Sequence, residues 1–204
     1  VDQNLLIMEY MRLIAERHDL VCLLHEKPYA GVNGSGKHNN WSLSTDGGKN
    51  LVDPGKTPRE KTRFLLFLAA IVRAVDEYQD LLRMSVAYPG NDHRLGGFEA
   101  PPAIISMFLG EEMEDIVNSI VEERVYEDHK AATMNLGIPS VPTFRKDTTD
   151  RNRTSPFAFT GNKFEFRSLG SSQNIAMPNV VINTAVAKVL SDMADTLEAA
   201  VAKG

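Results

Sequence analysis

The stretch that most constrains the fold is FAFTGNKFEFR, residues 157–167. Phenylalanines occupy alternate places in each half of it, and a Gly-Asn pair between the halves favours a tight turn. Because successive side chains of a strand point to opposite faces, the phenylalanines would share one face and Lys163, Glu165 and Arg167 the other. The stretch therefore predicts an antiparallel hairpin with an aromatic face and a charged face. A charged face of this kind is often simply the solvent face.

Helical patterns surround this hairpin. The clearest begins at Thr57-Pro58-Arg59-Glu60, a capping box with proline in the first turn, and is expected to run to about residue 87. Apolar periodicity predicts further helices over 3–18, over 102–130 and from about 174 to the end, the last with an apolar stripe suited to packing. Short apolar or alternating runs predict strands at 20–24 and 41–44, and residues 135–156 are expected to form a loop. The chain is thus predicted to be one α+β domain over 1–204, with antiparallel strands packed on long helices.

The composition excludes two classes of function. With a net charge of −5, the chain lacks the excess of Lys and Arg on which nucleic-acid binding depends. Its longest apolar run, residues 64–72, is much shorter than the roughly 20 residues that span a bilayer, so no membrane insertion is expected. The single cysteine, Cys22, fits a reducing compartment, and we expect a cytoplasmic protein.

A second informative stretch is GVNGSGKHNNWS, residues 31–42. The pattern G-x-x-x-x-G-K matches a phosphate-binding P-loop, but His38 stands where Ser or Thr should ligate magnesium, and the residues that follow favour a strand over a helix. Both differences argue against a P-loop. A plain loop with an incidental histidine is one alternative. The glycines permit close approach of a ligand, and Asn33, Asn40 and Ser42 add polar side chains, so a binding loop is the other.

Arginines gather on two further segments rich in glycine or proline. NDHRLGGFEAP contains Arg94 and Glu99, and DRNRTSP contains Arg151 and Arg153. The planar guanidinium group suits carboxylate and phosphate, while a glutamate can ligate magnesium or manganese or accept a proton. If these segments meet in space, they would form a metal-assisted site for anionic substrates.

Four motifs together resemble the catalytic domain of glutamine synthetase, and their sequence is most similar to the type III branch. They are NGSGKHNNWS, HRLGGFEAP, RNRTSP and KFEFR. The resemblance spans residues 33–167. It implies an enzyme that uses ATP and Mg²⁺ or Mn²⁺ to join ammonium to L-glutamate through γ-glutamyl phosphate, as a homo-oligomer at full length. It also implies that this chain is an incomplete C-terminal catalytic portion, and we expect it to be inactive alone.

By position, the resemblance implies roles for residues that contact glutamate and ammonium. Asn33 and Gly34 would border the amino acid, and Arg94 would hold its α-carboxylate. Arg167 would hold the γ-carboxylate. Glu99 would accept the proton that ammonium loses when it becomes a nucleophile.

The resemblance also implies a metal site and an ATP site. His38 and Glu165 would ligate one divalent metal ion. Ser42 and Lys163 would lie near ATP, with Lys163 in a place where the family commonly has arginine. Arg153 would face the transferred phosphoryl group, as both a catalytic and an ATP-binding residue.

Two other functions remain open on the sequence. One is a related ligase that joins glutamate to an amine other than ammonia, which would keep Arg94 and Arg167 but change the amine pocket. The other is a non-catalytic segment that contributes packing and oligomer contacts through its last helix. Binding of magnesium and an ATP analogue that depends on His38 would argue against the second.

Overall fold

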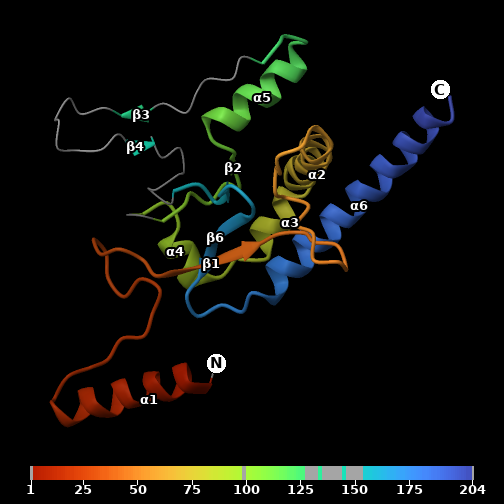
Figure 1. The fold of residues 1–204 in the computed structure, drawn as a ribbon. Coiled ribbons are helices and arrows are strands. Elements are labelled where there is room, and N and C mark those ends of the chain that lie inside the picture. The colour runs from red at the N-terminus through yellow and green to blue at the C-terminus, as the bar shows by residue number, and fades with distance from the viewer. Residues whose placement is uncertain (1, 98–99, 127–132, 135–143, 146–153, 204) are drawn as a thin grey trace.

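The computed structural model describes residues 2–97, 100–126, 133–134, 144–145 and 154–203. Within these ranges the chain forms six helices, a four-stranded mixed sheet and a separate two-stranded sheet (Figure 1). The predicted α+β class is confirmed. None of the helices in this part of the chain is long and apolar enough to cross a membrane.

The four-stranded sheet contains the predicted hairpin. Its order is β1 (Gly36–Trp41), β6 (Phe164–Gly170), β5 (Phe157–Phe159) and β2 (Met107–Phe108). β5 and β6 pair antiparallel, β1 pairs antiparallel with β6, and β2 pairs parallel with β5. The strand expected at 41–44 instead begins at Gly36. The end of the glycine-rich stretch is therefore part of the sheet, because Gly36 pairs with Gly170 of β6.

The aromatic face of the hairpin forms the centre of the core. Phe157 and Phe164 are fully buried and stack with 4.9 Å between ring centroids. Phe159 contacts Phe64 of the neighbouring helix at 5.6 Å. Offset and tilted aromatic pairs of this kind add to the stabilisation that comes from burying their surface. The alternation seen in the sequence thus identified the buried face correctly.

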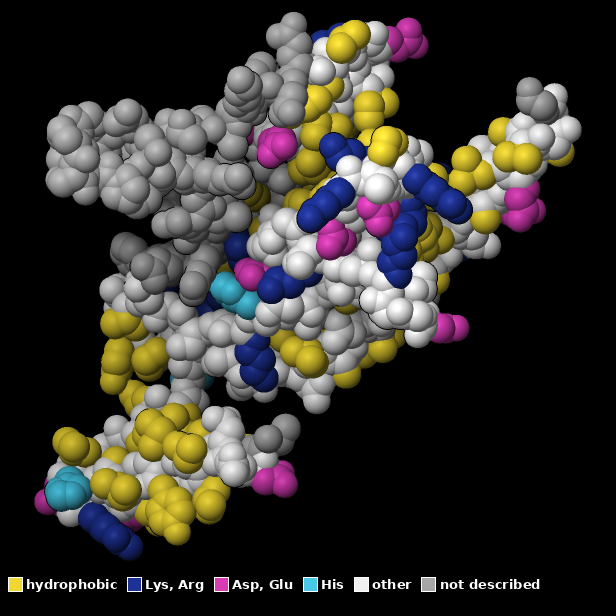
Figure 2. Space-filling view, viewed as in Figure 1, with side chains coloured by type: hydrophobic (Ala, Val, Ile, Leu, Met, Phe, Trp, Pro, Cys, Tyr) yellow, Lys and Arg dark blue, Asp and Glu magenta, His cyan; other side chains and the backbone are white. Residues whose placement is uncertain are grey.

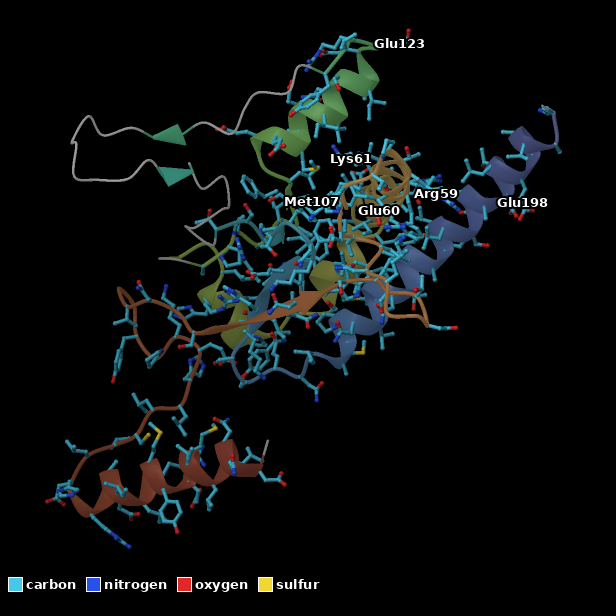
Figure 3. All side chains as sticks on the ribbon, in the orientation of Figure 1. Arg59, Glu60, Lys61, Met107, Glu123 and Glu198 are labelled. Atoms are coloured by element: carbon cyan, nitrogen blue, oxygen red, sulfur yellow. The ribbon has the colours of Figure 1, made fainter. Side chains whose placement is uncertain are left out.

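Helix α2 (Pro58–Glu77) begins at the predicted capping box. The hydroxyl of Thr57 accepts a hydrogen bond from the backbone N–H of Glu60 at 3.3 Å, and the Glu60 carboxylate accepts one from the N–H of Thr57 at 3.1 Å. Figure 3 shows Glu60 at this end of the helix. The helix buries Phe64, Leu68 and four further residues.

The prediction that this helix continues to residue 87 was wrong. Tyr78 has φ −121° and ψ 23°, outside the helical region, and α3 (Gln79–Met84) begins after it. The break redirects the chain, and Leu82 and Val86 then enter the core. Another short helix, α4 (Pro89–Arg94), follows, for which the sequence analysis predicted no helix. Pro89 lies in its first turn, where a missing N–H costs no hydrogen bond.

Residues 102–130 were predicted to be helical, and the structure is more divided. Over the described part of this range, β2 is followed by α5 (Glu111–Val121). Phe108, inside the predicted helical range, lies in β2 because that strand pairs with β5. The two-stranded sheet joins β3 (Thr133–Met134) to β4 (Phe144–Arg145). β4 falls inside the predicted 135–156 loop, much of which lies outside the described residues.

The predicted C-terminal helix is α6 (Ala176–Val201), which packs against α2 and α3. The buried part of its apolar stripe is Ile182, Val186 and Val189. Further along, Leu197 is exposed, and Figure 3 shows Glu198 pointing away from the other elements. The expectation of a packing stripe is thus confirmed as far as Met193, which is partly buried against the core.

The predicted N-terminal helix is α1 (Asp2–Arg17), and none of its residues is buried. It lies apart from the other elements, with hydrophobic side chains spread over its surface (Figures 1 and 2). The buried strand predicted at 20–24 was wrong, because that segment forms no strand and Val21 is 84% exposed. An apolar run can form a strand only where a partner strand offers hydrogen bonds, and none lies beside it in the described part of the chain.

Candidate functional site

The candidate site lies on the face of β1 and β6 that points away from α6. Asn39 and Trp41 of β1 turn towards α6, where they donate hydrogen bonds to Asn179 and Asn183 at 2.8 Å each. Because side chains alternate along a strand, the intervening His38 and Asn40 lie on the opposite face. His38 and Asn40 are exposed there.

A β-bulge shapes this face. Asn40 pairs with Glu165 and Asn39 with Phe166, but Lys37 pairs with Leu169, so β6 has one more residue than β1 opposite His38. Two residues of β6, Arg167 and Ser168, therefore lie opposite the single residue His38 of β1. Bulges redirect side chains and are common beside functional sites. Here the bulge sets His38 next to the charged residues of β6.

His38 and Glu165 meet on this face, as predicted. Their Nδ1 and Oε2 atoms are 3.5 Å apart, and the two side chains are 33% and 20% exposed. Two ligand atoms that each bind one metal ion at about 2.0–2.2 Å lie roughly 3–3.5 Å from one another. An imidazole nitrogen and a carboxylate oxygen suit a divalent cation, so this pair fits two positions of a metal site. No group of three candidate ligands occurs among the described residues.

Arg167 completes the charged row. It is 4% exposed, and its Nε donates to Glu165 Oε2 at 3.2 Å. Its backbone N–H donates to the carbonyl of Pro156 at 2.8 Å, which fixes the strand at this point. The Glu165 carboxylate therefore lies between an imidazole and a guanidinium. Removing either neighbour would leave this half-buried charge less well compensated.

Arg94 reaches the same strand from α4. It is 3% exposed, and its Nη2 donates to the carbonyls of Arg167 and Leu169 at 3.4 and 3.3 Å. Its Nε donates to Asn91 Oδ1 at 3.0 Å. Burial lowers the pKa of the Arg94 guanidinium, while the charge of Glu26 acts to raise it. An arginine starts from so high a pKa that it stays charged at neutral pH.

The glycine-rich stretch lies directly against this arginine. A Cβ added to Gly34 would come within 2.8 Å of Cδ of Arg94, and one added to Gly36 would come within 2.8 Å of Nη1. Contacts this short are not tolerated by real Cβ atoms, so only glycine fits without a shift. Gly34 and Gly36 therefore allow the backbone of this stretch to pack closely against Arg94, which explains why glycine stands at these two positions.

The remaining predicted residues are placed as follows. Asn33 is exposed in the loop before β1, and Ser42 is exposed just after β1 ends. Lys163 is half-buried in the turn before β6. Glu99 and Arg153 lie outside the described residues. The structure thus brings His38, Glu165, Arg167, Arg94 and Gly34 together, and the roles of these residues stay predictions.

Two buried polar residues beside the site were not singled out from the sequence. Asn91 is fully buried, and its amide donates to the carbonyls of Val86 and Ser168 at 2.9 and 2.8 Å. Glu26 is 1% exposed. Nothing in the sequence distinguishes it, because it stands two residues after the apolar run 20–24, as a residue beyond a strand end also would. The chemistry of the site is that of a cationic, partly buried surface with one carboxylate, suited to anions and a divalent cation.

Comparison with known proteins covers both halves of the chain. Residues 1–102 match the family described as "Glutamine synthetase, catalytic domain". The chain is 59% identical over 93% of its length to "Type-3 glutamine synthetase" of Dictyostelium discoideum, covering 26% of that protein. It is 49% identical over its whole length to "Glutamine synthetase" of Bacteroides fragilis (strain YCH46), covering 28% of it. It is 58% identical over 81% of its length to "Glutamine synthetase" of Butyrivibrio fibrisolvens, covering 23% of that protein. The chain thus spans about a quarter of the length of these curated relatives.

Proposed function

The chain belongs to the glutamine synthetase family, in its type III branch, and on this premise we propose that it forms part of an enzyme that joins ammonia to L-glutamate. The observation that carries the proposal is the row of His38, Glu165 and Arg167 on one face of the sheet, with Arg94 beneath it. These four residues come from three distant parts of the sequence, yet they meet in the arrangement that a metal-assisted reaction of anions requires.

Two arginines would bind the carboxylates of glutamate. Arg167 would hold the γ-carboxylate, and Arg94 would hold the α-carboxylate through the guanidinium edge that faces Gly36. Asn33 and Gly34 would border the amino acid. The close packing of Gly34 and Gly36 on Arg94 supports this assignment, because it places the loop and the arginine in one wall.

His38 and Glu165 would hold one Mg²⁺ or Mn²⁺ ion. When bound, such an ion neutralises negative charge on the phosphate groups of ATP. The carboxylate of Glu165 also keeps Arg167 oriented through the 3.2 Å hydrogen bond between them. One carboxylate would therefore serve both the cation and the substrate arginine, so the two binding events are expected to depend on each other.

The proposed reaction has two steps. The γ-carboxylate of glutamate attacks the terminal phosphorus of ATP, giving γ-glutamyl phosphate and ADP, and ammonia then displaces phosphate. Arg153, Lys163 and Ser42 would bind ATP, with Arg153 facing the phosphoryl group as charge spreads over its oxygens. Glu99 would accept the proton that ammonium gives up. The sequence motifs alone support the roles of Glu99 and Arg153.

The activity is proposed for a longer, cytoplasmic polypeptide that assembles as a homo-oligomer. The relatives that support it are about four times as long as this chain, and the His38–Glu165 pair offers two metal ligands where a closed site takes more. We therefore expect residues 1–204 alone to form no glutamine from glutamate, ammonium and ATP. The longest natural polypeptide that contains them is expected to do so, and to lose this activity in Glu165→Gln.

Binding of Mn²⁺ in the presence of a non-hydrolysable ATP analogue tests the site directly. We expect saturable binding by the longer polypeptide, weakened by roughly tenfold or more in His38→Ala, since changes in the shells around a metal cost 10–100-fold in affinity. His18→Ala is the matched control, because His18 lies in the exposed turn after α1. Equal affinities of the wild type and His38→Ala would refute the metal site. Product formed with another amine, but not with ammonium, would refute the choice of ammonia.

A further inference from the structure

Glu26 is a buried carboxylate that the proposed chemistry does not use. It lies between α1 and β1, and it is 1% exposed although the loop around it is largely exposed. Acidic residues are rarely buried to this extent unless they are paired or hydrogen-bonded. Its contacts therefore indicate what it does.

The side chain of Glu26 binds the turn that follows β6. Its Oε1 atom accepts a hydrogen bond from the backbone N–H of Ser172 at 3.0 Å and a short one from the Ser172 hydroxyl. Its backbone carbonyl accepts from the N–H of Ser35 at 2.6 Å, and the carbonyl of Ser35 in turn accepts from Ser171 at 3.2 Å. One residue thus ties the glycine-rich stretch to the end of β6.

The other carboxylate oxygen faces α4, the helix that carries Arg94. Oε2 would lie 3.2 Å from a Cβ placed on Gly90, and Oε1 would lie 3.2 Å from one placed on Gly170. Gly90 is in the first turn of α4, the helix that carries Arg94. The charge of Glu26 also stabilises the protonated form of Arg94. Glu26 therefore contacts or acts on all three segments that frame Arg94.

The pKa of Glu26 lies below its ordinary value, which favours the ionised form. Burial acts to raise the pKa, but the hydrogen bonds from Ser172 and from the residue's own backbone, with the charge of His25, together outweigh burial. A buried anion near a buried guanidinium, each with its own hydrogen bonds, is costly to form and also costly to disturb from one side. Such a pair is suited to fix geometry.

We propose that Glu26 is a positioning residue for glutamate: by holding Ser35 and Ser172 together, it keeps the glycine-rich stretch against Arg94, in the arrangement that receives the substrate carboxylate. This inference rests on the proposed function, because it concerns the same wall of the same site. Glu26 touches no substrate itself. It acts through the backbone of the loop and through the placement of Arg94.

The test compares Glu26→Ala with Glu26→Gln in the longest natural polypeptide that contains this chain. In Glu26→Ala, kcat/KM for glutamate is expected to fall by roughly ten- to a hundredfold, mostly through a higher KM, since small misplacements at a site have effects of that order. The KM for ATP should not change. Glu26→Gln retains an oxygen that can accept from Ser172, so it should recover most of the loss. Glu77→Ala, which removes an exposed carboxylate on α2, is the matched control and should resemble the wild type.

A purely structural role predicts a different result. It would lower the melting temperature and the amount of active enzyme, and so kcat, without moving the KM for glutamate. If Glu26→Ala does not fold, Ser172→Ala serves in its place and should raise the same KM by a smaller factor. An active wild type with an unchanged glutamate KM in these variants overturns this inference alone. A wild type that forms no glutamine overturns the proposed function, and the inference with it.

Discussion

Helices α1 and α2 have the same kind of sequence pattern but opposite surroundings. Both carry apolar residues three or four positions apart; α1 was predicted from that spacing, and α2 from its capping box. α2 buries six of its residues against the sheet and α6, whereas α1 buries none, and its Leu6 is 57% exposed. The pattern specifies a helix and the direction of its apolar face. What that face contacts is decided by the rest of the molecule.

The glycines of the chain show the same contrast. Gly34 and Gly47 lie in loops on either side of β1, and both have backbone angles that other residues can adopt. Gly34 is packed against Arg94, while the nearest atom to a Cβ on Gly47 would be Oγ1 of Thr45 at 3.8 Å. The residue type is identical, and only the neighbours differ.

The largest expected effect on stability comes from a comparison in which one leucine on each helix is replaced by alanine. Leu68 of α2 is 1% exposed, so Leu68→Ala should lower the free energy of unfolding by about 2–5 kcal/mol through lost burial and a new cavity. Leu6→Ala on α1 should change it by no more than about 0.5 kcal/mol. Urea unfolding of residues 1–204, followed by circular dichroism, measures both. A loss at Leu6 as large as that at Leu68 would mean that α1 packs on a partner in solution, and the contrast between the helices would fail.

A smaller effect is expected at the glycines. Gly34→Ala forces the loop away from Arg94 and should cost about 1–3 kcal/mol of unfolding free energy, the range for overpacked sites. Gly47→Ala meets only ordinary contacts and should stay within about 0.5 kcal/mol. The same unfolding experiment compares them. If both variants were neutral, the close contact between the glycine-rich stretch and Arg94 would not exist in solution.

The smallest expected effect on stability concerns the N-terminal capping box of α2, which Glu60 forms with Thr57. Hydrogen bonds from the backbone of Thr57 and Lys56 lower the pKa of Glu60 to about 2, from 4.5. Because the folded pKa is the lower one, the stabilisation by the ionised Glu60 is fully present above 4.5 and is lost as the pH falls towards 2. The stability difference between wild type and Glu60→Gln should therefore shrink over that interval and stay constant above it. A difference that is the same at pH 2 and pH 7 would rule out the charged cap.

Much of the secondary structure was predictable because its causes are local. The capping box at Thr57 and Glu60 places the start of α2 through contacts within one turn. The alternating phenylalanines place β5 and β6 through a hairpin. Predictions failed where a distant segment decides the outcome, as at residues 20–24, which have no strand partner among the described residues, and at Tyr78, where the helix breaks and Leu82 enters the core.

About half of the site residues predicted from the sequence lie together in the structure. Motif order indicated that His38, Glu165, Arg167 and Arg94 work together, and the structure brings them to one place. No feature of the sequence indicated the bulge at Arg167–Ser168 or the burial of Glu26. The bulge depends on the register between β1 and β6, which long-range pairing sets. The burial of Glu26 depends on its contact with Ser172, which is also distant in the sequence.

The sequence by itself determined where α1, α2 and α6 begin, where the hairpin forms and which face of the hairpin is apolar, because these depend on neighbours a few residues away. Only the tertiary structure decided that the glycine-rich stretch pairs with β6, that α4 delivers Arg94 beneath it, and that Glu26 joins the two. Those contacts link segments far apart in the chain. Their geometry therefore depends on tertiary packing and cannot be deduced from any one segment.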